Sequence, residues 1–251
     1  MREGLYLYCI ISSDKPQSFG LMGIGDRGDE LYTVCFDDLA AVVSKSPMVT
    51  YSISRENTLA HERAIEGVMK EHAVLPVRFG TIAEDELRIK RILEKEHDRF
   101  VNLLNIMANK KELGLKAIFK DEYVYKGILE KYEDIRDLKQ RIAALPSTKT
   151  YYQRMEIGKM VETALQKERE IHKKHILNVL MPLALETKIN TVYGERMILN
   201  AAFLVAKIKE TEFDLAINEL ADKYTGKIRF TYIGTVPPFN FVNLVIETSE
   251  Y

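Results

Sequence analysis

The chain has 251 residues, of which 46% are hydrophobic and 29% charged, a composition typical of a globular protein with a buried core. Its 36 lysine and arginine residues nearly balance 37 aspartate and glutamate residues, whereas a nucleic-acid-binding protein usually has a basic surplus. The N-terminal residues do not resemble a signal peptide, and the apolar stretches are too short to cross a bilayer. We therefore expect a cytoplasmic protein with neither a nucleic-acid nor a membrane partner.

The first half of the chain combines strands with two helices. Residues 4–11 carry alternating apolar side chains, which indicates a strand buried on at least one face. In chain order, the sequence predicts strands at 4–11, 31–36, 39–44, 73–80 and 113–119 and helices at 54–72 and 84–109. Strands with two helices between them are typical of an α+β sandwich. We expect residues 1–120 to form a ferredoxin-like domain with helices on one face of its sheet.

The second half is predicted to form a C-terminal domain at 121–251. It begins with a helical connector (121–188), which is expected to bend near Gly158 and Pro182, and continues with a smaller α+β unit (189–251). The predicted elements, in chain order, are helices at 121–144 and 151–188, a strand at 197–208, a helix at 212–224 and strands at 227–234 and 241–247.

Gly23, Gly25 and Gly28 have the spacing of a dinucleotide-binding loop. Such a loop binds pyrophosphate when a strand precedes it and a helix follows it. Here a strand is predicted directly after the glycines, so we interpret them as a turn and expect no bound nucleotide.

Two groups of histidines are candidate metal ligands. His61 and His72 share one face of the first predicted helix but lie about 16 Å apart along its axis, so they cannot hold one ion. Glu168, His172 and His175 share one face of the long helix, inside its apolar stripe. They could bind a metal or form a hydrogen-bond network, and we expect the network because lysines flank the two histidines.

Catalytic motifs are missing from the sequence. It contains no nucleophile elbow, Walker loop or H-E-x-x-H pair. Tyr6 and Tyr8 on the first strand are reminiscent of an RNA-recognition sheet, but the basic and aromatic run that accompanies them in such sheets is missing. We expect no enzymatic activity, no cofactor and no metal.

Several stretches resemble the GvpF/GvpL family of gas vesicle proteins, in family order and over nearly the whole chain. Residues 5–11 (LYLYCII) resemble the family's opening LYLYAIV strand, and residues 74–81 reproduce its most specific run, VLPVRFGT, in full. Residues 199–205 (LNAAFLV) and 234–242 (GTVPPFNFV) resemble LNAAYLV and GPWPPYNFV. The family's proline pair usually follows a tryptophan, whereas this chain has Val236 there and no tryptophan at all.

The resemblance implies a non-catalytic accessory or minor structural protein of gas vesicle assembly, with two α+β domains, the first ferredoxin-like. Its implied partners are the hydrophobic shell subunit and other accessory proteins, and we expect it to support nucleation or growth of the shell. An alternative is a ligand-sensing regulatory protein, because ferredoxin-like sandwiches carry many functions. A deep polar pocket would favour the alternative, whereas an apolar patch with a polar rim would favour the assembly factor.

The VLPVRFGT run contains the first two candidate interface residues. Period-2 alternation places Leu75, Val77 and Phe79 on a core face and Pro76 and Arg78 on the other. Because proline cannot donate to a sheet ladder, Pro76 indicates an edge strand or a bulge that another chain can approach. Arg78 could hold a carboxylate of its own fold, or it could anchor a partner, since arginine is enriched at interfaces.

The other candidate interface residues are Pro237, Pro238 and Phe239. A stiff, extended segment with an aromatic tip loses little entropy when it docks on a partner. The same residues could instead form a rigid turn that inserts Phe239 into its own domain.

Overall fold

The computed structural model describes residues 2–25, 27–143, 145–146 and 149–248. These residues form two compact units. The first unit joins the chain up to Glu112 with the chain from Thr235 onwards, and the second spans Leu113–Gly234. The α+β class is confirmed, since each unit combines a sheet with helices. The boundaries differ from those predicted, 1–120 and 121–251, because the C-terminal residues contact the N-terminal sheet.

The first unit is built on an antiparallel sheet with the strand order β2-β3-β4-β1-β5, in which β6 also pairs with β1. Its elements are β1 (Glu3–Ser12), β2 (Ser18–Leu21), β3 (Glu30–Phe36), β4 (Leu39–Pro47), α1 (Arg55–Met69), β5 (Val74–Pro76), β6 (Ile82–Ala83), α2 (Glu86–Lys95) and α3 (His97–Met107). As Pro76 indicated, β5 is an edge strand.

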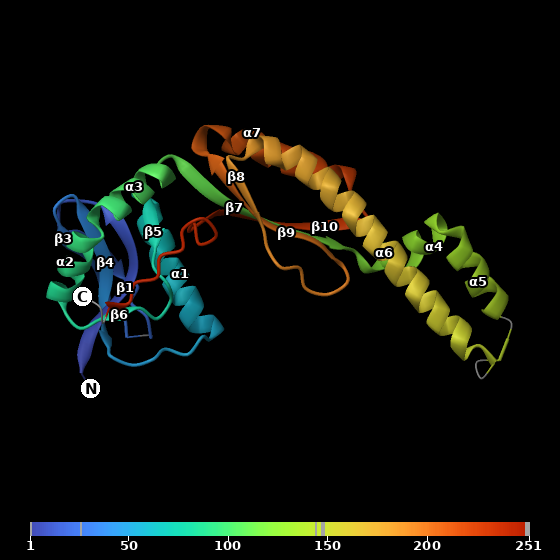
Figure 1. Cartoon of the computed structure of the whole chain (residues 1–251), viewed down its shortest axis with the longest axis horizontal. Coiled ribbons are helices and arrows are strands. Elements are labelled where there is room, and N and C mark those ends of the chain that lie inside the picture. Colours follow the sequence, from blue (N-terminus) through green and yellow to red (C-terminus); the bar gives the residue numbers. More distant parts are fainter. Residues whose placement is uncertain (1, 26, 144, 147–148, 249–251) are drawn as a thin grey trace. The chain divides into compact units, whose positions relative to one another are not determined.

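Strand β1 is the centre of this unit, and its residues from Gly4 to Ile11 are all buried. A bulge between Leu7 and Cys9 changes the alternation, so that Cys9 joins Tyr8 in the core beneath α1. Helix α1 packs on this face, and α2 and α3 pack on the other face of the sheet (Figure 1). Helices therefore cover both faces of the sheet, whereas the sequence predicted helices on one face only.

The predicted helix over 84–109 is two helices. Asp85 caps α2, and its carboxylate accepts the Arg88 backbone N–H at 2.8 Å. At Glu96 the backbone leaves helical geometry (φ −100°, ψ 9°), and α3 begins at the next residue. The apolar stripe continues across this break, so hydrophobic periodicity alone did not reveal it.

The second unit is built on a sheet with the strand order β10-β7-β9-β8. Its elements are β7 (Lys110–Phe119), the π-helix η1 (Tyr123–Gly127), α4 (Ile128–Lys131), α5 (Glu133–Ala143), α6 (Tyr151–Leu180), the 3-10 turn η3 (Met181–Leu183), β8 (Glu186–Ile189), β9 (Met197–Ala206), the 3-10 turn η4 (Lys207–Lys209), α7 (Glu210–Lys223) and β10 (Ile228–Val236).

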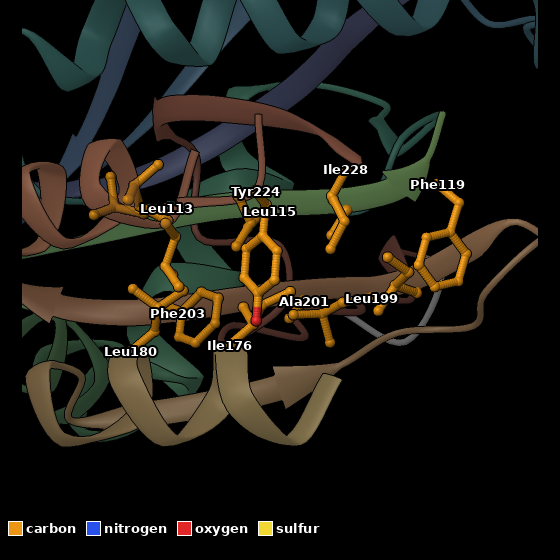
Figure 2. Close-up of a cluster of buried hydrophobic side chains, with 14 of the residues drawn as sticks. Leu113, Leu115, Phe119, Ile176, Leu180, Leu199, Ala201, Phe203, Tyr224 and Ile228 are labelled. Atoms are coloured by element: carbon orange, nitrogen blue, oxygen red, sulfur yellow. The ribbon is translucent and has the colours of Figure 1, made fainter. Parts of the chain in front are cut away.

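The core of the second unit lies between its sheet and the helices α6 and α7 (Figure 1). Figure 2 shows alternate side chains of β7 and β9 that point toward α6. These buried side chains are Leu113, Leu115, Phe119, Leu199, Ala201 and Phe203 from the strands, Ile176 and Leu180 from α6, and Tyr224 and Ile228 beyond α7.

Two predictions for the second half of the chain are wrong. Helix α6 ends at Leu180, before Pro182, and residues 186–189 form the edge strand β8 in place of a last helical turn. The predicted strand at 241–247 is not a strand, because its only ladder contact is one parallel bridge between Val77 and Leu244.

Candidate partner-binding groove

Arg78 and Phe239, which are 161 positions apart in the sequence, line one groove of about 400 Å³ in the first unit. Helix α1 forms one wall, and the residues after β5 and those after Pro238 form the others. Most of the exposed surface of this groove is apolar. The lining residues are Thr58, His61, Glu62, Pro76, Arg78, Phe79, Phe239, Val242, Asn243 and Leu244.

The chain turns sharply after β5, and this turn exposes Arg78. The strand ends at Pro76, although the Val77 N–H still donates to the sheet at 2.9 Å. Gly80 has φ 84°, a conformation that glycine adopts without strain. The Thr81 hydroxyl donates to the Arg78 carbonyl at 2.7 Å and closes the turn. The Arg78 side chain is exposed as a result.

Phe79 does not share the environment of Leu75 and Val77. Those two side chains are fully buried, whereas Phe79 is half-buried and packs against the core beneath α1. Its ring centroid lies 6.3 Å from that of Tyr6 and 5.7 Å from that of His61. The predicted common core face is wrong because the extended alternation stops at Pro76.

His61 lies at the base of the groove and is 3% exposed. Its Nε2 lies 3.2 Å from the Val77 carbonyl, which can only accept, so Nε2 carries the proton and donates. Its Nδ1 accepts from the Tyr6 hydroxyl at 3.1 Å, and that oxygen in turn accepts the Gly80 N–H at 2.9 Å. Burial lowers the pKa of His61 to about 4 despite the bond to Val77, so the ring is neutral at pH 7.

Phe239 is carried on a tight turn. The Phe239 N–H donates to the Pro237 carbonyl at 2.7 Å, and the Pro238 carbonyl accepts from two later amides. The buried Glu112 carboxylate accepts both the backbone N–H and the side-chain amide of Asn240. The segment is therefore a fixed turn and not the extended chain considered above.

The five candidate interface residues differ in accessibility. Pro76, Pro237 and Pro238 are buried and shape the backbone around the groove. Arg78 is exposed, and Phe239 is 41% exposed with one side of its ring toward His61.

A second hollow, of about 530 Å³, adjoins the groove. Arg78 and Phe79 line both hollows, and the second one continues between residues 48–53 and 245–248. The C-terminal segment (residues 242–248) is held there by few polar contacts. The Arg78 N–H donates to the Leu244 carbonyl at 3.1 Å, and Thr248 donates through its hydroxyl to β6 at 2.8 Å.

Exposed apolar side chains surround Arg78 at the two hollows. Ile53 is 86% exposed, and Val49, Val245 and Phe239 are each about 40% exposed. We call these four residues and Arg78 the Arg78 face.

Among the described residues, Arg78 is the only cationic side chain that lines either hollow, since His61 is neutral. Glu62 and Glu247 are the acidic ones, and burial, together with the neighbouring Glu66, raises the pKa of Glu62. Within the described part of the chain, the Arg78 side chain forms no ion pair or hydrogen bond. The possibility that it holds a carboxylate of its own fold is therefore not realised among these residues.

Glu168, the first residue of the candidate metal group, belongs to a hydrogen-bond network. Tyr123, Lys131 and Tyr132 all donate to its fully buried carboxylate. Burial opposes its ionisation, but these three bonds outweigh that effect and lower its pKa. Nε2 of the buried His172 lies 3.5 Å from the carboxylate, too far for a strong hydrogen bond.

The other two histidines that were candidate metal ligands also make polar contacts within the protein. His175 contacts Lys223 and Tyr224 at 2.9 and 3.0 Å, and His72 contacts Gln17 at 2.9 Å. The glycines at 23–28 form a turn that leads into β3, as predicted, with the Gly23 N–H bonded to the Asp29 carbonyl. Asp26 lies outside the described residues.

The sequence analysis did not predict one cluster of two aspartates and a histidine. Asp37, Asp38 and His97 place one donor atom each within 4.8 Å of one another, at the turn between β3 and β4 and the start of α3. His97 Nε2 lies 2.7 Å from the Asp38 carboxylate, and this bond raises the pKa of His97. The two aspartates are exposed, and the group is an ion pair that joins α3 to the turn.

The structural role of Glu112 was also missed. A buried glutamate inside a strand, such as Glu112, indicates that another part of the fold supplies hydrogen-bond donors to its carboxylate. The partner, Asn240, lies 128 positions away, and no local pattern connects the two.

Among the described helices, none is long and apolar enough to cross a membrane. The chain matches the family model described as gas vesicle synthesis protein GvpL/GvpF over residues 4–243. It is 26% identical to gas vesicle protein F of Dolichospermum flosaquae, over 96% of this chain and 98% of that protein. It is 25% identical to gas vesicle protein F1 of Halobacterium salinarum, over 100% of this chain and 98% of that protein.

Solved structures have the same fold. The crystal structure of GvpF from Anabaena superposes with a TM-score of 0.78 at 22% identity, covering 96% of this chain and 99% of that one. GvpF from Microcystis aeruginosa gives a TM-score of 0.74 at 21% identity, with 96% and 99% covered. The protein therefore belongs to the gas vesicle GvpL/GvpF family.

Proposed function

We propose that this protein is an accessory or minor structural protein of gas vesicle assembly that binds the hydrophobic shell subunit through the Arg78 face. Binding there would limit aggregation of the subunit and support nucleation or growth of the shell. The protein would act without catalysis or cofactor, in the cytoplasm and at the gas vesicle, alongside other accessory proteins. Family membership supports the link to gas vesicles, and binding of the shell subunit is the more specific proposal.

The composition of the Arg78 face supports a protein partner. Four exposed apolar side chains and one cation line the two hollows, together with the carboxylates of Glu62 and Glu247. Exposed apolar groups that cluster and have a polar rim are typical of protein interaction sites. A small-metabolite site would instead enclose most of its ligand and carry a few polar groups that converge on it. This contrast favours an assembly factor over a ligand-sensing regulator.

The experiment is a pull-down of the cognate shell subunit by the full-length protein and its variants. Arg78→Ala and Phe239→Ala should each reduce retention by about tenfold or more, since Arg and aromatic anchors dominate interface energies. Tyr152→Ala, which truncates an 82% exposed aromatic of the second unit, is the matched control and should bind normally. Thermal melts of all variants separate lost binding from lost folding.

Two results would contradict the proposal. One is wild-type retention by both folded variants, and the other is a loss of retention that merely follows a lower melting temperature. Either result would make Arg78 and Phe239 structural residues only.

A further inference from the structure

Arg78 is a cation beside a mostly apolar groove, and it has no counter-ion among the described residues. It lines both hollows and, among the described residues, is the only cationic side chain in either lining. Beside it are Phe79 and the accessible ring of Phe239. Neither Glu62 nor Glu247, the carboxylates of the linings, lies within ion-pair distance of its guanidinium, and no other described residue pairs with it.

A docked partner would change the energetics of this guanidinium. It would exclude water from the groove and lower the local dielectric, so that an unpaired charge there would become costly. A carboxylate meets this requirement best, because its two oxygens match the planar donors of arginine. A partner that offered only hydrocarbon at this point would leave the cation buried and unpaired.

The rim restricts the partner further. Glu62 on α1 lines one hollow, and Glu247 on the C-terminal segment lines the other. They would repel additional acidic groups and any polyanion, including nucleic acid. The site therefore matches a single carboxylate between neutral apolar side chains.

We infer that the segment of the shell subunit bound at this face carries one aspartate or glutamate that pairs with Arg78, beside apolar side chains that fill the groove lined by Phe239. This inference rests on the proposed function, and it adds the chemistry of the partner segment.

Charge exchange tests the inference. Arg78→Glu in the full-length protein should weaken retention of the shell subunit about 10- to 100-fold, and Arg78→Lys should weaken it less. Each aspartate and glutamate of the shell subunit is then replaced by lysine, one at a time. One of these variants should bind Arg78→Glu better than it binds the wild type. Arg63→Glu, a charge reversal at an exposed arginine of α1, is the matched control and should have no effect.

The outcomes separate the inference from the proposed function. If Arg78→Glu binds like the wild type while Phe239→Ala does not, the face is a docking site but the carboxylate pair is absent. If no lysine variant restores binding to a folded Arg78→Glu protein, the inference is likewise overturned. If Arg78→Glu and Phe239→Ala both bind normally, the proposed function fails as well.

Discussion

His61 connects the core of the first unit to the Arg78 face. Both of its ring nitrogens are used inside the protein, one as a donor to Val77 and one as an acceptor from Tyr6. This arrangement requires the neutral ring. The sequence placed His61 on one face of the first predicted helix, and its burial behind Phe79 and Phe239 could not be predicted from helical spacing.

The pKa of His61 predicts a pH-dependent stability. The pKa is about 4 in the folded state and about 6.5 in the unfolded chain, so the unfolded chain binds more protons between these values. The free energy of unfolding should therefore fall as the pH is lowered from 6.5 to 4, by up to about 3 kcal/mol from this residue. Urea unfolding followed by circular dichroism measures the effect.

The control for this prediction is His61→Phe. The variant should be less stable at pH 7, because the Tyr6 hydroxyl and the Val77 carbonyl lose their partner. Its stability should nevertheless depend less on pH between 6.5 and 4. Equal pH dependence in the two proteins would contradict the assigned burial of a neutral His61.

Local sequence rules predicted single features of the candidate residues but not their surroundings. Pro76 indicated an edge strand because proline lacks an N–H, and β5 is one. Arg78 was named from strand alternation and residue type, and Phe239 from its place after two prolines; the structure brings both to one groove. The alternation rule failed at Phe79, because it assumes an extended chain and the strand ends three residues earlier.

At the scale of elements, the positions of periodic segments were predicted, but breaks within them and short polar elements were not. Strand β1 and helix α1 have clear periodicities and lie where they were expected. Strand β8 was missed because its four residues, Glu186–Ile189, are mostly exposed and show no apolar alternation. Its place is set by pairing with β9, which is a tertiary contact.

The start of α2 offers a test at this scale. Asp85 satisfies the Arg88 N–H, one of the helix donors that have no partner within the helix. Asp85→Ala should lower the free energy of unfolding by about 1 kcal/mol, the usual cost of losing an N-cap. Asp14→Ala, at an exposed loop position, should change it little. Equal stability of the two variants in urea titrations would show that this cap is unimportant.

At the scale of the whole molecule, the C-terminal segment explains why the predicted domain boundaries differ from the observed units. Its one bridge to Val77 and the hydrogen bond of Thr248 tie it to the first unit. These contacts span more than 160 positions, and no local pattern carries them. They also complete the Arg78 face, because Val245 and the groove residues near Leu244 come from this segment.

The family assignment rests on the whole chain and not on a single motif. The model match covers residues 4–243, and the match to gas vesicle protein F of Dolichospermum flosaquae extends over nearly the full length of both chains. The central claim that goes beyond this assignment is that the Arg78 face binds the shell subunit.

Hydrogen exchange on the full-length protein, with and without the shell subunit, tests that claim most directly. Bound subunit should slow amide exchange at residues 48–53, 77–81 and 239–248, because docking at the two hollows excludes water from these segments. Exchange in α5 and the N-terminal half of α6 should not change. Protection confined to those helices, or no protection at the three segments when the subunit is bound, would contradict the account.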